Sequence, residues 1–350
     1  MVKHITMHLT QKCNLRCKYC HVAAETEKST DKYIDPTIIK NIFVEDIHSI
    51  SIAGGEPFVM KGRLYDFIDK AQKYVKNIAI TTNGILITDD DLKKLKEKKI
   101  RLQFSVDGLE HYHDGIRGRG NFKRTLKNIK KTINYGLSVN ILTTVSRENL
   151  SDIPQFLEFI DTLDIDNIHL LHFTPKGRGT ALPEVEMQPE EWMKFVDQVK
   201  NSTKHVRTWI QPRFIKPEDL AKLDPERTIN KCNHLKYDFA YLDLESGDVY
   251  PCGLAYGTEL CIGNLIENSL PEIVNKHLET VNELLPKECI ACSYEKACAG
   301  GAKCYALYRY GDISRKDPFC TNTEKYIPIC PFPAVLISGP EMKTSKPTIV

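Results

Sequence analysis

Apolar residues between positions 3 and 180 follow two alternating patterns. Short β-branched runs predict strands at 3–10, 48–54, 77–84, 100–108, 137–145 and 167–173. Between these runs, apolar residues recur every three or four positions, which predicts amphipathic helices. The helical stretches lie at 62–75, 88–99, 121–135 and 153–163. This alternation favours parallel strands joined by right-handed crossovers. Six strands are fewer than a complete barrel needs, so an α/β partial barrel or an open doubly wound sheet is predicted.

The pattern changes after this region. A loop is predicted at 174–189 and a helix at 190–201, and short strands and turns follow, as in YLDLESGDVYPCG (241–253). The last residues read as a loosely held tail. We therefore predict a barrel domain at 1–205, a small cysteine-rich domain at 206–335 and a tail at 336–350.

Charge and hydropathy exclude several classes of protein. Lys and Arg number 48 against 46 Asp and Glu, so the net charge of +2 gives no electrostatic case for nucleic acid or a membrane surface. There is no run of 18 apolar residues, which a membrane-spanning helix would need. The first residues lack an export pattern, and we expect a cytoplasmic protein.

The cysteines are numerous and clustered. Of 12 in the chain, Cys13, Cys17 and Cys20 lie at the start, and nine lie between Cys232 and Cys330. Disulfides are rare in the reducing cytosol, so metal ligation is the favoured role. The long gap between the two groups predicts a cysteine-poor catalytic domain between two metal-binding regions.

The first group has the spacing C-x3-C-x2-C, in KCNLRCKYCH. Three thiolates suit three corners of a [4Fe–4S] cube and leave one iron open to chelate a small molecule. Two alternatives remain at this stage: a zinc site completed by His21, and a bridge to a distant cysteine.

The same motif resembles that of the radical S-adenosylmethionine (radical SAM) enzymes. Further resemblances, each weak alone, follow at the strand ends: GGEP (54–57), TTNG (81–84), SVDG (105–108), HDGIRGRG (113–120) and FTPKGRG (173–179). The resemblance implies that S-adenosylmethionine binds the open iron and is cleaved reductively to a 5′-deoxyadenosyl radical, which removes hydrogen from a substrate. The cofactor contacts that it implies are Tyr19, Gly54, Gly55, Glu56, Pro57, Asn83, Ser105, Asp107 and Arg178.

The second group of cysteines resembles a SPASM domain, which in its relatives holds two auxiliary [4Fe–4S] clusters. The resemblance implies an outer cluster on Cys289, Cys292, Cys298 and Cys320, and an inner cluster that begins with Cys232 and Cys252. Here CAGGAKC departs from the usual C-x-G-G-C, so that Cys304 comes two residues late. We expect Cys304 and Cys261 to complete the inner cluster and Cys330 to be spare. An inner cluster with an open iron, a smaller cluster and zinc ribbons are the alternatives.

By resemblance, the fold is a partial (βα)6 TIM-like barrel followed by a SPASM domain, with S-adenosylmethionine and three [4Fe–4S] clusters as cofactors. A flavodoxin or ferredoxin is implied as the electron donor. We expect oxidative modification, such as crosslinking, of a ribosomally made peptide. The alternatives are a small cofactor precursor of haem type and, in another class, a non-enzymatic electron carrier. Strand one begins almost at once, so we expect peptide recognition by the barrel mouth, the 174–189 loop, the SPASM domain or a separate leader-binding protein. The sequence identifies no catalytic acid or base, and His8 is expected to be a packed or surface histidine.

Overall fold

The computed structural model describes residues 2–26, 33–211, 213–220, 232, 237, 239–280, 285–321, 325–329 and 335–339. Its main feature is an 11-stranded sheet with the order β11-β10-β9-β1-β2-β3-β4-β5-β6-β7-β13, beside a two-stranded sheet of β8 and β12. The strands are β1 (His4–His8), β2 (Ser49–Ala53), β3 (Asn77–Thr82), β4 (Arg101–Ser105), β5 (Val139–Val145), β6 (Asn167–His172), β7 (Arg207–Ile210), β8 (Phe214–Ile215), β9 (Phe239–Asp243), β10 (Asp248–Tyr250), β11 (Gly263–Asn264), β12 (Ile327–Pro328) and β13 (Val335–Ser338).

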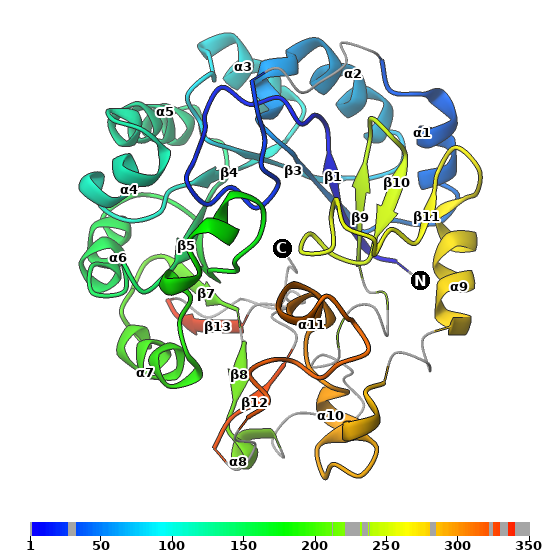
Figure 1. The fold of residues 1–350 in the computed structure, drawn as a ribbon. Coiled ribbons are helices and arrows are strands. Elements are labelled where there is room, and N and C mark those ends of the chain that lie inside the picture. The colour runs from blue at the N-terminus through cyan, green and yellow to red at the C-terminus, as the bar shows by residue number, and fades with distance from the viewer. Residues whose placement is uncertain are drawn as a thin grey trace.

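Helices line the outside of the curved sheet (Figure 1). The α-helices are α1 (Pro36–Ile42), α2 (Lys61–Ala71), α3 (Asp89–Glu97), α4 (Glu110–Arg117), α5 (Asn121–Asn134), α6 (Ile153–Asp161), α7 (Pro189–Val199), α8 (Pro217–Leu220), α9 (Leu270–Thr280), α10 (Glu295–Cys298) and α11 (Lys303–Tyr310). Short 3-10 helices lie at η1 (Pro57–Met60), η2 (Gly177–Ala181), η3 (Pro183–Val185) and η7 (Lys287–Cys289).

The six strands predicted from the sequence are confirmed as β1 to β6, which pair in chain order and in parallel. Two further parallel strands, which the periodicity did not reveal, extend this core. β7 pairs with β6, and β9 pairs with the free side of β1 in the register His4↔Phe239 to His8↔Asp243. Among the residues described, the sheet ends at β11 and β13 and does not close. The fold is therefore an open, barrel-like sheet, as predicted.

The helices form where the sequence provides both an apolar face and a cap. At the start of α3, Thr88 Oγ1 accepts a hydrogen bond from Asp91 N, and the Asp91 carboxylate accepts one from Thr88 N, which completes a capping box. Leu92 and Leu95 of this helix are buried. They join one large core, in which the apolar faces of the strands meet those of the surrounding helices.

The cysteine-rich region is fastened to the barrel by a fully buried ion pair. One terminal nitrogen of Arg213 donates to both carboxylate oxygens of Asp317, at 2.9 and 2.8 Å. Asp317 also accepts from the backbone nitrogens of Ala302 and Phe319. The guanidinium of Arg213 lies 3.9 Å from the ring centroid of Tyr305. The pair thus joins the segment after β7 to the start of α11, which carries Cys304, and to the loop that carries Cys320.

The region predicted as a separate domain contributes strands to the barrel sheet. β9 and β10 continue the sheet beyond β1, and residues 336–338, assigned to the tail by the sequence, lie in β13 against β7. The domain limits remain predictions, and residues 340–350 lie outside the described part of the chain. No helix in that described part is long and apolar enough to cross a bilayer.

Replacing Arg213 by Met tests the buried pair. We expect a loss of about 3–5 kcal/mol of stability, because the Asp317 carboxylate stays buried without its cation. The apparent midpoint of thermal unfolding, recorded without oxygen, should fall markedly.

The matched control is Lys70→Met, which breaks the partly exposed Lys70–Asp66 pair of 2.8 Å on α2. Exposed pairs of this spacing contribute only about 0.3–0.5 kcal/mol. Equal midpoints for the two variants would contradict the role assigned to the buried pair.

Candidate functional site

The first three cysteines lie on a loop that follows β1 at the carboxyl end of the sheet. Backbone hydrogen bonds hold this loop, from Cys13 N to Glu25 O at 3.1 Å and from Lys18 N to Ile116 O at 3.1 Å. The pKa of the Cys13 thiol is raised to about 12, mainly by burial and in part by the neighbouring Cys17 and Cys20. The three thiols are therefore gathered in one place. His21, the alternative zinc ligand, is exposed.

The GGEP turn lies directly beneath the cysteine loop. Gly55 N donates to Thr10 O at 2.7 Å and Glu56 N donates to Lys12 O at 2.9 Å. A Cβ atom on Gly55 would stand 2.2 Å from Lys12 O, and one on Gly54 would stand 2.5 Å from Thr10 O. Both glycines are thus required for contact with the cysteine loop itself.

The Glu56 side chain ties GGEP to TTNG. Its carboxylate accepts from Thr82 Oγ1 and Asn83 N, each at 2.8 Å, and from Phe58 N at 3.2 Å. Burial raises the pKa of this carboxyl to about 7, although the hydrogen bonds from the three donors lower it. The Asn83 amide in turn donates to Asn14 Oδ1 at 2.8 Å, within the cysteine loop. Pro57 is buried at the start of η1.

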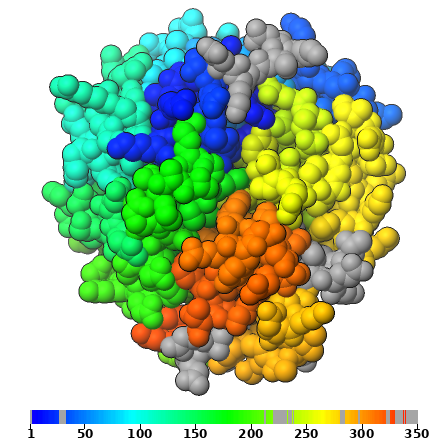
Figure 2. Space-filling model, in the orientation of Figure 1, coloured from blue at the N-terminus to red at the C-terminus, as the bar shows by residue number. Residues whose placement is uncertain are grey.

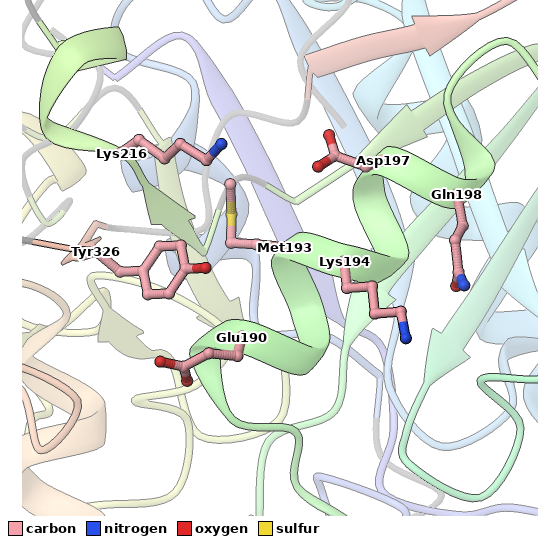
Figure 3. A pocket seen from close by; sticks show the side chains of 7 residues that line it. All are labelled: Glu190, Met193, Lys194, Asp197, Gln198, Lys216 and Tyr326. Atoms are coloured by element: carbon pink, nitrogen blue, oxygen red, sulfur yellow. The ribbon is translucent and has the colours of Figure 1, made fainter.

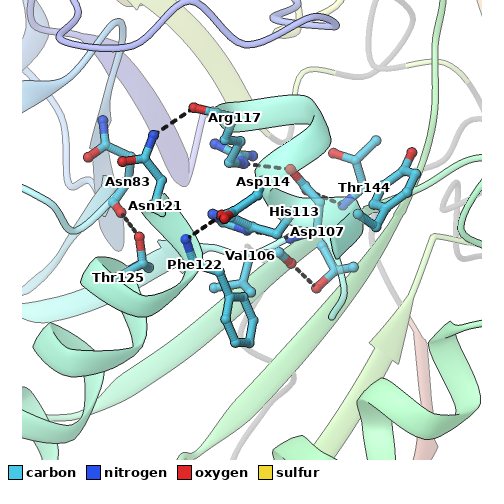
Figure 4. Close-up of polar contacts among 12 residues, drawn as sticks. Asn83, Val106, Asp107, His113, Asp114, Arg117, Asn121, Phe122, Thr125 and Thr144 are labelled. Carbon is cyan, nitrogen blue, oxygen red and sulfur yellow. Dashed lines mark hydrogen bonds and ion pairs between the residues drawn. The ribbon is translucent and has the colours of Figure 1, made fainter. Parts of the chain in front are cut away.

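SVDG carries a carboxylate that forms a buried ion pair (Figure 4). Asp107 is fully buried, accepts from Arg117 Nε at 2.5 Å and from Thr144 N at 3.0 Å. Burial opposes its ionisation, but Arg117 outweighs burial and holds the pKa of Asp107 below its ordinary value. Ser105 is half-buried at the end of β4.

Arg117 is a site residue to which the sequence assigned no role. It belongs to HDGIRGRG. Its positive charge lowers the pKa of the Cys17 thiol, so it lies near the cysteine loop. Asp114 of the same motif accepts from the backbone nitrogens of Gly120 and Phe122 and so caps α5 (Figure 4). The fixed spacing of Asp114 and Arg117 after a strand-ending turn was the available signal.

The loop after β6 clamps the cysteine loop from the other side. Arg178 donates through Nε to Cys17 O at 2.8 Å and through a terminal nitrogen to Ala24 O at 2.7 Å. Its backbone nitrogen donates to Cys20 O at 3.1 Å. Gly177 has a φ of +58°, and a Cβ atom there would stand 2.4 Å from Cys20 O. Only glycine permits this approach.

Tyr19 is the aromatic residue predicted to lie beside the adenine. Its ring is buried and meets Phe173 edge-on, with centroids 5.7 Å apart. Tyr112, Ile116 and Val185 complete the same apolar cluster. The cluster lies between the cysteine loop, α4 and the loop after β6.

The four outer cysteines come together in the cysteine-rich region. The pKa of the Cys298 thiol is raised to about 11, mainly by burial and in part by Cys320 and Cys289. Cys292 likewise raises the pKa of both Cys289 and Cys320. The structure therefore brings Cys289, Cys292, Cys298 and Cys320 into one group.

Three of the inner cysteines share neighbours. Cys232, Cys252 and Cys304 are all buried. The pKa of Tyr237 is raised by burial and by Cys232 and Cys252. The pKa of Tyr308 is raised by burial and by Cys304 and Cys252. Each tyrosine thus lies beside two of the three thiols.

Cys261 stands apart from these three. It is exposed and its thiol donates to Gly263 O at 3.4 Å. Like Cys252, it lies in the connection between the antiparallel strands β10 and β11. Cys330, predicted to be spare, lies outside the described residues.

A buried cation tests whether clusters fit among these cysteines. Lys303 is fully buried, and its ammonium has no hydrogen-bond partner among the residues described. It lies beside Cys232, Cys289 and Cys298. A buried, unpaired ammonium is costly, and thiolate-ligated clusters would supply the missing negative charge. Among all the residues that the structure describes, no three His, Cys, Asp or Glu side chains stand close enough to hold a single metal ion.

His8 is a packed histidine, one of the two positions expected for it. It lies at the end of β1 with 1% exposure, and both ring nitrogens are without partners in the structure as described. Its ring is tilted against those of Tyr256 and Tyr241, with centroids 4.0 and 5.1 Å apart. The alternation of His4 and His8 with apolar residues was the signal that this side chain faces the inside of the sheet.

A separate cleft of about 380 Å³ lies along α7 (Figure 3). It is lined by Glu190, Met193, Lys194, Asp197, Gln198, Lys216 and Tyr326. None of these is a cysteine or a predicted cofactor contact, so we assign the cleft no part in the chemistry.

The cysteine loop, GGEP, TTNG and SVDG all lie within residues 7–160, which match the model of the radical SAM superfamily. These residues are a radical SAM domain. The chain is 26% identical over 356 residues to the AdoMet-dependent heme synthase of Nitratidesulfovibrio vulgaris, covering 94% of each chain. It is 25% identical to the mycofactocin maturase MftC of Mycolicibacterium smegmatis, covering 91% of this chain and 82% of the relative.

Solved structures show a similar fold for almost the whole chain. Streptococcus suis SuiB, bound to its precursor peptide SuiA, matches with a TM-score of 0.69 at 17% identity, covering 92% of this chain and 76% of SuiB. The shared fold includes the cysteine-rich region. The radical SAM family implies S-adenosylmethionine and a [4Fe–4S] cluster as cofactors.

Gly177→Ala tests the clamp on the cysteine loop. An alanine Cβ collides with the Cys20 carbonyl, so the loop must shift and the three thiols must separate. We expect the variant to bind less iron after anaerobic reconstitution and to cleave little S-adenosylmethionine.

Gly120→Ala is the control, because Gly120 has a φ of +78° with nothing within 4 Å of the added carbon. It carries the same backbone strain of about 1–2 kcal/mol without the collision. Normal iron content in both variants would show that close approach at residue 177 is unimportant.

Proposed function

We propose that this radical SAM enzyme holds three [4Fe–4S] clusters. Cys13, Cys17 and Cys20 hold the first; Cys289, Cys292, Cys298 and Cys320 hold the outer auxiliary cluster; and Cys232, Cys252, Cys304 and Cys261 hold the inner one. The observation that carries the proposal is the gathering of the cysteines into groups, with the buried Lys303 between two of them. When bound, the first cluster supplies the electron that cleaves S-adenosylmethionine.

The proposed cofactor site lies where the motif loops meet above the carboxyl ends of the strands. Tyr19, Gly54, Gly55, Glu56, Pro57, Asn83, Ser105, Asp107 and Arg178 form it. Glu56, Asp107 and Arg178 already bond to neighbouring loops. They therefore hold the cofactor pocket in shape, and the half-buried Ser105 is the side chain best placed to bond a ligand directly.

The proposed substrate is a ribosomally made peptide that is oxidised at a C–H bond. Two observations support it: the similarity to the mycofactocin maturase and the fold shared with SuiB in complex with its precursor peptide. The sheet is open in the residues described, and an extended peptide can add hydrogen bonds to a strand edge. A low-potential flavodoxin or ferredoxin and a separate leader-binding protein are the proposed partners.

A small precursor of haem type is the second candidate. The similarity to AdoMet-dependent heme synthase extends over 94% of both chains, at 26% identity against 25% for the mycofactocin maturase. Either substrate requires the same oxidative chemistry from this chain. A non-enzymatic electron carrier is disfavoured, because it has no use for the motif loops of a radical SAM domain.

The cluster assignment predicts separable losses of iron. Replacing Cys13, Cys17 and Cys20 together by Ala should remove about four irons per chain, the content of one cube, and abolish 5′-deoxyadenosine formation. Cys292→Ala should also lower the iron content yet retain cleavage of S-adenosylmethionine. Cleavage by the triple variant would refute the assignment of the first cluster.

The substrate is tested by anaerobic incubation with two kinds of candidate. Small peptides encoded beside this protein should lose about two mass units per event, because two hydrogens leave in an oxidative crosslink. An iron-loaded coproporphyrin provides the other arm. Turnover of the porphyrin with no mass change in any peptide would replace the first candidate by the second.

A further inference from the structure

Two buried lysines lie at the junctions between the three groups of cysteines. Lys176 is 6% exposed and Lys303 is fully buried. Lysine is almost never buried so deeply unless it is paired, because removing an ammonium from water is costly. Lys176 belongs to the FTPKGRG loop and Lys303 stands in CAGGAKC directly before Cys304, and each lies beside thiols from two different groups.

Lys176 lies between the first and the inner groups. Its ammonium donates to Gly253 O at 2.9 Å and to Tyr256 O at 2.6 Å, in the turn that follows Cys252. Burial lowers the pKa of Lys176, while Cys252, Cys304 and Cys20 raise it, so all three thiols lie nearby. Two residues further on, Arg178 holds the carbonyl of Cys17. One short segment therefore contacts both groups, and Figure 2 shows the corresponding blue, green and yellow regions adjoining on one face.

Lys303 lies between the inner and the outer groups. It begins α11 and precedes Cys304 directly. Cys232 of the inner group and Cys289 and Cys298 of the outer group lie beside its ammonium. Its ammonium has no hydrogen-bond partner within the described residues, whereas that of Lys176 has two. The position of Lys303 is thus explained by charge rather than by hydrogen bonding.

We propose that Lys176 and Lys303 are positioning residues that raise the reduction potentials of the auxiliary clusters. A fixed positive charge favours the reduced form of a cluster, since reduction adds negative charge, and the effect is strong where water is excluded. Lys176 acts on the inner cluster. Lys303 acts on both the inner and the outer clusters. The two auxiliary sites thereby become better acceptors for an electron that leaves the substrate.

This inference depends on the proposed auxiliary clusters, and the test separates the two. The full chain carrying Cys13→Ala, Cys17→Ala and Cys20→Ala is reconstituted, so that only auxiliary clusters remain. Midpoint potentials are then measured by an EPR-monitored redox titration. A further Cys292→Ala change identifies the outer signal. If the parent chain binds no auxiliary iron, the proposed function fails before the lysines are tested.

Lys176→Met should lower the potential of the inner cluster and leave that of the outer cluster unchanged. Lys303→Met should lower both potentials. Lys176→Arg and Lys303→Arg keep the charge and should restore values near those of the parent. Lys316→Met is the matched control: its charge acts on Cys320 from a half-exposed position, so water screens it and a smaller shift is expected.

Unchanged potentials in both Met variants, with iron retained, would overturn the inference. If a Met variant loses its iron, thermal unfolding of the unloaded chain decides. Lys303→Met should stabilise the unloaded protein, because it removes an unpaired buried charge, and the gain should disappear once iron is bound. A destabilised unloaded variant would show a purely structural role and would equally overturn the inference.

Discussion

The parallel pairing of β9 with β1 is the constraint on which the rest of the molecule depends. β1 leads directly into the first cysteine loop, and β9 leads through the β10 hairpin to Cys252. Their five-residue register fixes the distance between the two cysteine regions. Arg63 on α2 reinforces the pairing, because it bonds both Glu245 and the Leu244 carbonyl in the hairpin. The cysteine-rich region is therefore a continuation of the barrel sheet rather than an attachment to it.

The motif residues form hydrogen bonds with one another, although their motifs lie far apart in the sequence. Glu56 joins GGEP to TTNG, Asn83 joins TTNG to the cysteine loop, and Arg178 joins the loop after β6 to Cys17. The Glu56 contact is buried and the other two are partly buried, so each is strengthened by the lowered dielectric around it. The proposed cofactor site is consequently held by a network that connects four strand ends.

The sequence predicts the repeated elements well and the long-range contacts poorly. β1 to β6 and the capping box of Thr88 depend on local pattern, which periodicity detects. β7 has only four residues, and the place of β9 beside β1 depends on pairing between segments far apart in the sequence, which no local pattern reveals. The same reason hid the roles of Arg117, Arg213 and Lys303: a buried charge has meaning only through a partner brought near by folding. The cysteine groups could be recognised in the sequence because metal ligation favours fixed spacing between ligands.

The place of β1 in the sheet has a consequence for synthesis on the ribosome. β1 is made first, but the strand that covers one of its edges ends at Asp243, so much of the barrel emerges while that edge has unpaired amides and carbonyls. An uncovered edge is a template for association with other chains. Nascent chains that stall before β9 are accordingly exposed to aggregation, and rapid release or chaperone protection matters more for this chain than for a barrel whose strands pair only with their immediate neighbours.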